Sequence, residues 1–199
     1  MKTQIYKALF IIVFLALLPS HLCSQVRFGI RGSVHRTNIS KVHWESVGRT
    51  AGSLGGVIQI PLGYDNQFFF QPEVLYSLEG EKDDGDSHGI LMRQDYFQNY
   101  VNIPLMFRAY FSESDNEFFG ELGPQIGILV YEKSKKEDRL NYSKPESLNL
   151  SIGAGIGYSF LRKYEISIRY NYGLTDVYKK YPEQQRTSNL GVALTYMFE

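Results

Sequence analysis

From residue 25 onward, apolar and polar positions alternate along the chain with a period of two. The clearest run is Leu148 to Phe160, in which every even position is apolar and every odd position is Gly, Ser or Asn. Strict alternation is typical of β-strands whose two faces meet different environments. Eight such runs are present, at residues 25–34, 50–61, 67–80, 94–111, 116–131, 147–161, 164–174 and 186–198.

The connections between these runs alternate in length as well. In chain order they have about 15, 5, 13, 4, 15, 2 and 11 residues. Short turns alternating with long loops, together with an even number of strands, are typical of an antiparallel up-and-down β-barrel, and bacterial outer-membrane barrels follow this plan. The long connections would then lie outside the cell, and both termini would be periplasmic.

The polarity of the two faces separates a membrane barrel from a soluble one. One face is small or polar, while the other is continuously apolar, with aromatic residues near the ends of the runs. These aromatic residues include Phe68, Tyr76, Phe97, Phe111, Tyr158, Phe160, Tyr196 and Phe198. An apolar exterior with aromatic girdles is the arrangement that lipid requires. The sequence therefore predicts an all-β, eight-stranded transmembrane barrel whose narrow polar lumen is filled by side chains.

The amino terminus resembles a secretory signal. Lys2 and Lys7 precede an apolar run of 11 residues, Ala8 to Leu18, which Pro19 ends. A run of this length is too short to span a bilayer, because a spanning helix needs about 20 apolar residues. We expect residues 1–24 to be a cleaved signal peptide and 25–199 a single barrel domain. Cys23 suggests a lipoprotein signal, but Leu22 stands where such signals have a small residue.

Composition narrows the function classes. The chain of 199 residues has 21 basic and 21 acidic side chains, and removal of the leader leaves 19 bases against 21 acids. No basic excess indicates a nucleic-acid partner. The mean hydropathy of −0.25 argues against a polytopic helical membrane protein. The mature chain has no cysteine, so disulfide and thiol chemistry are excluded.

Several segments resemble the PorT-like outer-membrane β-barrel family of Bacteroidetes. The most specific are Pro72 to Ser77, Ile-Pro-Leu at 103–105, Gly-Pro at 123–124 and Arg-Tyr-x-x-Gly-Leu at 169–174. Their order and spacing cover essentially the whole mature chain. The resemblance implies an outer-membrane barrel. The founding member of that family belongs to a secretion and maturation system for surface proteases.

Counting alternate positions along each predicted strand places eight charged side chains on the polar face. They are Arg27, Arg31, Glu73, Glu79, Arg108, Glu121, Glu165 and Arg169. Of these, we expect a lumen charge network of Arg31, Glu73, Arg108, Glu121, Glu165 and Arg169. Buried charges are tolerated when they are paired. The network is then either a plug of salt bridges that stiffens the barrel, or a gate in which Glu73 or Glu121 exchanges arginine partners.

No catalytic, cofactor-binding or metal site is expected. His35, His43 and His88 lie in or beside the first two long connections, and none has a second ligand at metal-binding spacing. The segment 81–89 is rich in acids but lacks the terminal Glu of a calcium loop, so we interpret it as solvated surface. Glycosidase chemistry needs two carboxylates in a substrate-sized cleft, which a filled lumen does not supply.

Three functions remain open. The first is a non-enzymatic barrel with a structural or interaction role, in protein secretion or envelope assembly as the resemblance implies. The second is a small gated channel, and the third is a lipid-modifying enzyme. Expected partners are outer-membrane lipid, the barrel-insertion machinery, which reads a carboxy-terminal aromatic such as Phe198, and envelope or secretion proteins at the extracellular loops. Trp44, Tyr178 and Tyr181 are candidate anchors there.

Overall fold

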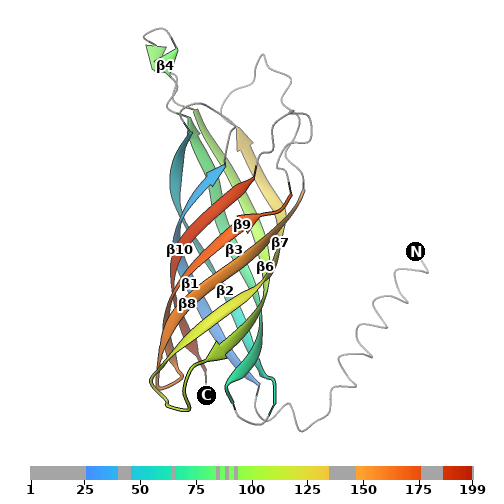
Figure 1. Ribbon diagram of the computed structural model, residues 1–199. Coiled ribbons are helices and arrows are strands. Elements are labelled where there is room, and N and C mark those ends of the chain that lie inside the picture. Colours follow the sequence, from blue (N-terminus) through green and yellow to red (C-terminus); the bar gives the residue numbers. More distant parts are fainter. Residues whose placement is uncertain are drawn as a thin grey trace, which may run out of the picture.

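The computed structural model describes residues 26–39, 46–63, 66–83, 86–87, 90–91, 94–134, 147–175 and 186–198. Eight strands form the barrel (Figure 1). They are β1 (Arg27–Ile39), β2 (Ser46–Pro61), β3 (Phe68–Asp83), β6 (Gln94–Tyr110), β7 (Glu117–Ser134), β8 (Leu148–Phe160), β9 (Tyr164–Gly173) and β10 (Thr187–Met197). β4 (Asp86–Ser87) and β5 (Ile90–Leu91) pair as a separate two-stranded ribbon.

The eight strands close on themselves in the order β1-β10-β9-β8-β7-β6-β3-β2, and every neighbouring pair is antiparallel. The closing seam runs from Gly29 opposite Met197 to Ile39 opposite Thr187. Just beyond β10, the Phe198 amide donates to the Phe28 carbonyl (2.6 Å). Closure leaves the barrel without a free sheet edge. The backbone N–H and C=O groups of such an edge would have no hydrogen-bond partners in lipid. The predicted all-β, eight-stranded antiparallel barrel is confirmed.

The two ends of the barrel differ. At the short-turn end, residues 62–67, 111–116 and 161–163 connect β2 to β3, β6 to β7 and β8 to β9. The other four connections leave the opposite end, which we call the long-loop end. The wall there is uneven, because β3, β6 and β7 have 16, 17 and 18 residues whereas β8, β9 and β10 have 13, 10 and 11. Figure 1 shows the β4–β5 ribbon beyond the end of this taller side.

The strands run further toward the long-loop end than alternation alone predicts. β1 continues to Ile39 instead of ending at residue 34, and β3 continues to Asp83 instead of 80. In these extensions the ladder of backbone hydrogen bonds continues without an apolar face to mark it. One consequence is a correction to the sequence analysis: His35 lies within β1 and is buried, not in a loop or at the rim.

Burial is inverted relative to a soluble protein. Leu54 and Ile156 on the outer face are 67% and 66% exposed, while Glu73 and Arg108 inside are each 1% exposed. β9 alternates exposed and enclosed positions along its whole length. In the described part of the chain, no helix is long and apolar enough to cross a membrane.

An aromatic belt surrounds part of the short-turn end. The ring centroids of Phe118 and Phe160 lie 4.8 and 4.7 Å from the ring centroid of Tyr158. The ring centroid of Tyr196 lies 5.2 Å from that of Tyr164 and 5.5 Å from that of Phe198. Amphipathic rings in this position match the interface between hydrocarbon and headgroups.

The outer face generates a prediction about depth. Ile156→Arg, in the middle of β8, should lower the free energy of unfolding by about 2–4 kcal/mol, because a cation there faces hydrocarbon. Leu148→Arg, on the same face at the long-loop end of β8, should cost only about 0–1 kcal/mol. Equilibrium unfolding by guanidinium in lipid vesicles measures both. Equal costs at the two positions would contradict a lipid-facing exterior.

Candidate functional site

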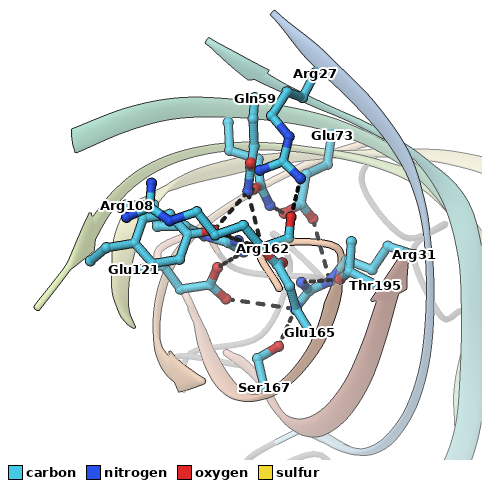
Figure 2. Close-up of polar contacts among 12 residues, drawn as sticks. Arg27, Arg31, Gln59, Glu73, Arg108, Glu121, Arg162, Glu165, Ser167 and Thr195 are labelled. Carbon is cyan, nitrogen blue, oxygen red and sulfur yellow. Dashed lines mark hydrogen bonds and ion pairs between the residues drawn. The ribbon is translucent and has the colours of Figure 1, made fainter. Parts of the chain in front are cut away.

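The structure brings together the six side chains predicted to form a lumen charge network. Arg31 comes from β1, Glu73 from β3, Arg108 from β6, Glu121 from β7, and Glu165 and Arg169 from β9. Each is at most 6% exposed. Figure 2 shows five of them, all but Arg169, converging from different strands inside the barrel wall. They meet because every one of them occupies an inward position of its strand.

Five of the six form a continuous chain of charge-assisted hydrogen bonds. Arg169 donates from Nη1 and Nη2 to the two oxygens of Glu73 (2.9 and 2.7 Å) and from Nε to Glu121 Oε1 (2.7 Å). Arg108 donates to Glu121 Oε2 (2.8 Å) and to Glu165 Oε2 (2.6 Å). Every carboxylate in this series of hydrogen bonds therefore contacts at least one guanidinium, and two arginines share Glu121.

Arg31 is attached to this chain more loosely. Its guanidinium lies 3.8 Å from Glu73 Oε2 and 3.6 Å from Glu121 Oε1, beyond hydrogen-bond distance. Its hydrogen bonds go to Thr195 Oγ1 (3.1 Å) and Ser167 Oγ (2.8 Å). The network thus holds three arginines and three glutamates and has no net charge, but one arginine is held by hydroxyls.

Neutral side chains that the sequence analysis missed complete the short-turn side of the network. Gln71 donates to Glu73 (2.7 Å), and Tyr110 donates from its hydroxyl to Glu165 (2.7 Å). Gln59 donates to Gln71 Oε1 (2.9 Å). Strand parity places all three on the inward face, so counting every polar inward residue, and not only the charged ones, would have found them.

A small aromatic core of Phe69, Tyr110 and Phe119 lies on the short-turn side of the network. The Arg108 guanidinium stands over the Phe119 ring, 3.9 Å from its centroid. Phe119 fits there because the neighbouring strand carries Gly157, where an added Cβ would lie 2.3 Å from the ring. Packing between a large residue and a glycine leaves the plug little space at this end.

A second cluster ties the short turns together. Arg162, in the turn 161–163, has a left-handed backbone (φ 48°) and pairs with Glu117 on β7. It also donates to the backbone carbonyl of Asn66 in another turn (2.6 Å), and Arg27 donates to the Arg162 carbonyl. The predicted inward Arg27 therefore belongs to this cap and not to the central network (Figure 2).

The long-loop half of the lumen is lined mainly by hydroxyl, amide and imidazole groups, together with the Glu79 carboxylate. His35 contacts Ser33 Oγ through Nδ1 (3.3 Å) and Ser77 Oγ through Nε2 (3.4 Å). Glu79, the other predicted inward charge outside the network, accepts a hydrogen bond from Asn102 (2.8 Å). Within the described ranges, no three His, Cys, Asp or Glu side chains gather where they could hold a metal ion.

The match to a family model agrees with this architecture. The model described as "Outer membrane protein beta-barrel domain" matches residues 19–179. The chain belongs to this outer-membrane β-barrel family. Its location is therefore the bacterial outer membrane, and the inverted burial of the barrel is its adaptation to lipid. The comparison with curated proteins gives no match.

Solved outer-membrane barrels share the fold. The outer membrane enzyme PagL is similar with a TM-score of 0.51 at 10% identity, over 83% of this chain and 98% of PagL. Neisserial surface protein A is similar with a TM-score of 0.48 at 11% identity, over 86% and 97%. OprG from Pseudomonas aeruginosa is similar with a TM-score of 0.47 at 13% identity, over 87% and 96%. At these identities the likeness concerns the fold alone.

Some predicted features of this outer-membrane barrel lie outside the described residues or their described side chains. They are the signal segment 1–24, the acidic segment 81–89, His43, His88, and the candidate anchors Trp44, Tyr178 and Tyr181.

The ion pairs generate a second prediction. Glu73→Gln leaves Arg169 and Arg31 with one carboxylate fewer, and should lower the free energy of unfolding by about 3–5 kcal/mol. The double change Glu73→Gln/Arg169→Gln restores neutrality, so it should cost less than the sum of the two single changes. Denaturant unfolding in detergent micelles measures all three.

Ser159→Ala is the matched control. Ser159 is fully buried in the same lumen, and its hydroxyl makes no hydrogen bond. Its replacement should change the free energy of unfolding by at most about 0.5 kcal/mol. A cost for Glu73→Gln no larger than that of the control would show that the pair with Arg169 contributes nothing to stability.

Proposed function

We propose that this protein is a PorT-like, non-enzymatic outer-membrane barrel with a structural or interaction role in protein secretion or envelope assembly. The observation that carries the proposal is the neutral plug. Glu73, Glu121 and Glu165 are each held by an arginine and are almost completely buried. A lumen sealed in this way leaves the loops and the outer surface as the parts of the molecule that meet other molecules.

The segments that carry the PorT resemblance contact one another in the fold. Glu73 in the segment 72–77 and Arg169 in the segment 169–174 form the bidentate ion pair. Gly123 of the Gly-Pro motif abuts the Ile-Pro-Leu motif, since an added Cβ would lie 2.1 Å from the Leu105 carbonyl oxygen. These motifs therefore build one part of the lumen and its wall, which supports a common plug in PorT-like barrels.

We place the short turns and both termini in the periplasm. The first residues of β1 and the last residues of β10 lie at the short-turn end, where the Met197 amide donates to the Lys163 carbonyl (2.8 Å). Outer-membrane barrels have short periplasmic turns and longer extracellular loops. This orientation also fits export by a cleaved signal peptide at residues 1–24 and recognition of Phe198 by the insertion machinery.

The geometry around His35 supports a non-enzymatic role. Its Ser77 neighbour is 3.4 Å away, but both side chains are buried inside the lumen. The cavity beside them has a volume of about 40 Å³. Ligand pockets have volumes of about 300–1,000 Å³, so no lipid headgroup fits next to this pair.

The role in secretion is tested by comparing the surface and secreted proteomes of a clean deletion strain with those of its parent. We expect a defined set of exported proteins to be lost and their precursors to accumulate in the periplasm. The wild-type gene should restore them. A Trp44→Ala/Tyr178→Ala/Tyr181→Ala variant should restore the barrel but not export. An unchanged proteome would contradict the secretion role.

A small gated channel is the second candidate, because Arg31 stands between Glu73 and Glu121 without a hydrogen bond to either. Recording of single-channel currents in planar bilayers distinguishes a plugged barrel from a gated channel. The plug predicts no single-channel events for the wild type, and Glu73→Ala and Arg169→Ala should lose stability without opening a pore. Reproducible wild-type conductance would favour the channel.

A further inference from the structure

Among the barrel-strand side chains that the structure describes, Arg36 is the one charged group that points outward, toward lipid. It lies on β1 between His35 and Thr37, which are both buried in the lumen, so its own side chain is on the outer face. Its partners on the two neighbouring strands are Thr50 and Leu190, which are exposed as Arg36 is. A charge on a lipid-facing wall is costly unless it reaches the interface or finds a counter-charge.

The position of Arg36 along β1 is that of the membrane interface at the long-loop end. The outward residues that precede it on β1 are Phe28, Ile30, Gly32 and Val34. From Phe28 to Arg36 the strand rises by about 26 Å, and its tilt reduces this to about 20 Å along the barrel axis. The apolar band of an outer-membrane barrel is about 25 Å tall. Arg36 therefore lies near the boundary of this band, at the end opposite the aromatic belt.

The strands beside β1 change from apolar to polar at the same level. Toward the long-loop end, the outward residues pass from Leu190 to Ser188 on β10 and from Leu54 to Thr50 on β2. On β9 the outward residue opposite Ser188 is Tyr172. Tyrosine is enriched at the interface between hydrocarbon and headgroups. These neighbours therefore mark the same boundary that the depth of Arg36 indicates.

A second arginine, Arg186, lies on the same outer face just before β10. Its guanidinium stands over the outward ring of Tyr172, 5.8 Å from the ring centroid, and Nη1 donates to the Tyr172 hydroxyl (3.4 Å). Leu190 is opposite Arg36, so Arg186 lies about 13 Å further toward the long-loop end on the neighbouring strand. Two guanidiniums thus follow the closing seam of β1 and β10 from the edge of the apolar band into the headgroup region.

The counter-charge for Arg36 is not found among the described residues. No described Asp or Glu of the barrel strands shares its outer face, and within this part of the chain its guanidinium has no hydrogen-bond or ion-pair partner. Phosphate is the anion that lipids place at this depth, and a guanidinium binds phosphate through two parallel hydrogen bonds. In the outer leaflet of a bacterial outer membrane, a glycolipid carries this phosphate.

We propose that Arg36 and Arg186 form a binding site for the phosphorylated headgroup of an outer-leaflet glycolipid. Arg36 binds a phosphate at the boundary of the hydrocarbon, and Arg186, held against Tyr172, contacts the headgroup further out. The acyl chains pack on the apolar wall toward the short-turn end, where Val34 and Val192 are 63% and 47% exposed. The inference rests on the orientation proposed above, in which the long loops are extracellular, and does not depend on a role in secretion.

Native mass spectrometry of the refolded full barrel in detergent micelles measures lipid binding directly. The probes are lipid A, its dephosphorylated form with the same acyl chains, and phosphatidylglycerol as an anionic lipid without a sugar phosphate. We expect the wild type to retain lipid A with higher affinity than either of the other two lipids. Equal affinity for the dephosphorylated form, or for phosphatidylglycerol, would overturn the proposal.

Variants of the two arginines locate the site. Arg36→Gln and Arg186→Gln should each lower the affinity for lipid A about fivefold, equivalent to about 1 kcal/mol for one arginine near a lipid surface. The two sites are far enough apart for their effects to combine, so the double variant should lose about 25-fold. Arg36→Lys should retain most of the affinity, because the charge stays. Leu190→Gln, opposite Arg36 on the same face, is the matched control and should bind lipid A as the wild type does.

Two further results would overturn the lipid site. Displacement of lipid A by millimolar inorganic phosphate would indicate a site for free phosphate. A double variant that folds and binds lipid A as the wild type does, but does not restore export in the deletion strain, would assign the arginines to a protein partner. Failure of the secretion role is a separate outcome, because an unchanged secreted proteome has no bearing on lipid affinity in micelles.

Discussion

The pairing of buried charges is the interaction on which the rest of this barrel depends. Lipid on the outside forces the apolar face outward, so the polar face of every strand points into a lumen only eight strands wide. Arg31, Arg108 and Arg169 enter that space together with three glutamates, and the ion pairs join residues of different strands. The register between strands is thereby tied to the ion pairs, because a shift by one residue would turn these side chains toward lipid.

The plug also depends on residues that contribute no charge. β8 carries Gly155 and Gly157 on its inner face, where an added Cβ would lie 3.0 Å from Glu121 Oε1 and 2.3 Å from the Phe119 ring, respectively. β7 supplies the large side chains and β8 supplies the space. This division explains how the Glu121 carboxylate and the aromatic core fit one narrow cross-section. Substitution of Gly155 would displace Glu121, and substitution of Gly157 would displace Phe119, although neither change removes a charge.

Much of the fold and part of the site follow from alternation alone. Parity assigns Glu73, Glu165 and the other network residues to the lumen because the side-chain period of a strand is two. Alternation does not show how far a strand continues past the apolar band toward the long-loop end. For that reason the sequence analysis places His35 outside β1. Nor does it tell which arginine contacts which glutamate, since that depends on strand tilt and closure. Alternation cannot predict the turn cluster of Arg162 either, because that cluster depends on a left-handed backbone in a three-residue turn.

The lumen is divided along its axis. The short-turn half contains the paired charges and the aromatic core, whereas the other half is lined mainly by hydroxyls, amides and His35. A charged plug excludes solutes because opening it would separate ions in a space of low polarizability. Hydroxyl and amide groups, in contrast, exchange hydrogen bonds with water at little cost. The side chains that fill the lumen are consequently paired ions and aromatic rings toward the short turns, and mainly hydroxyls and amides toward the long-loop end.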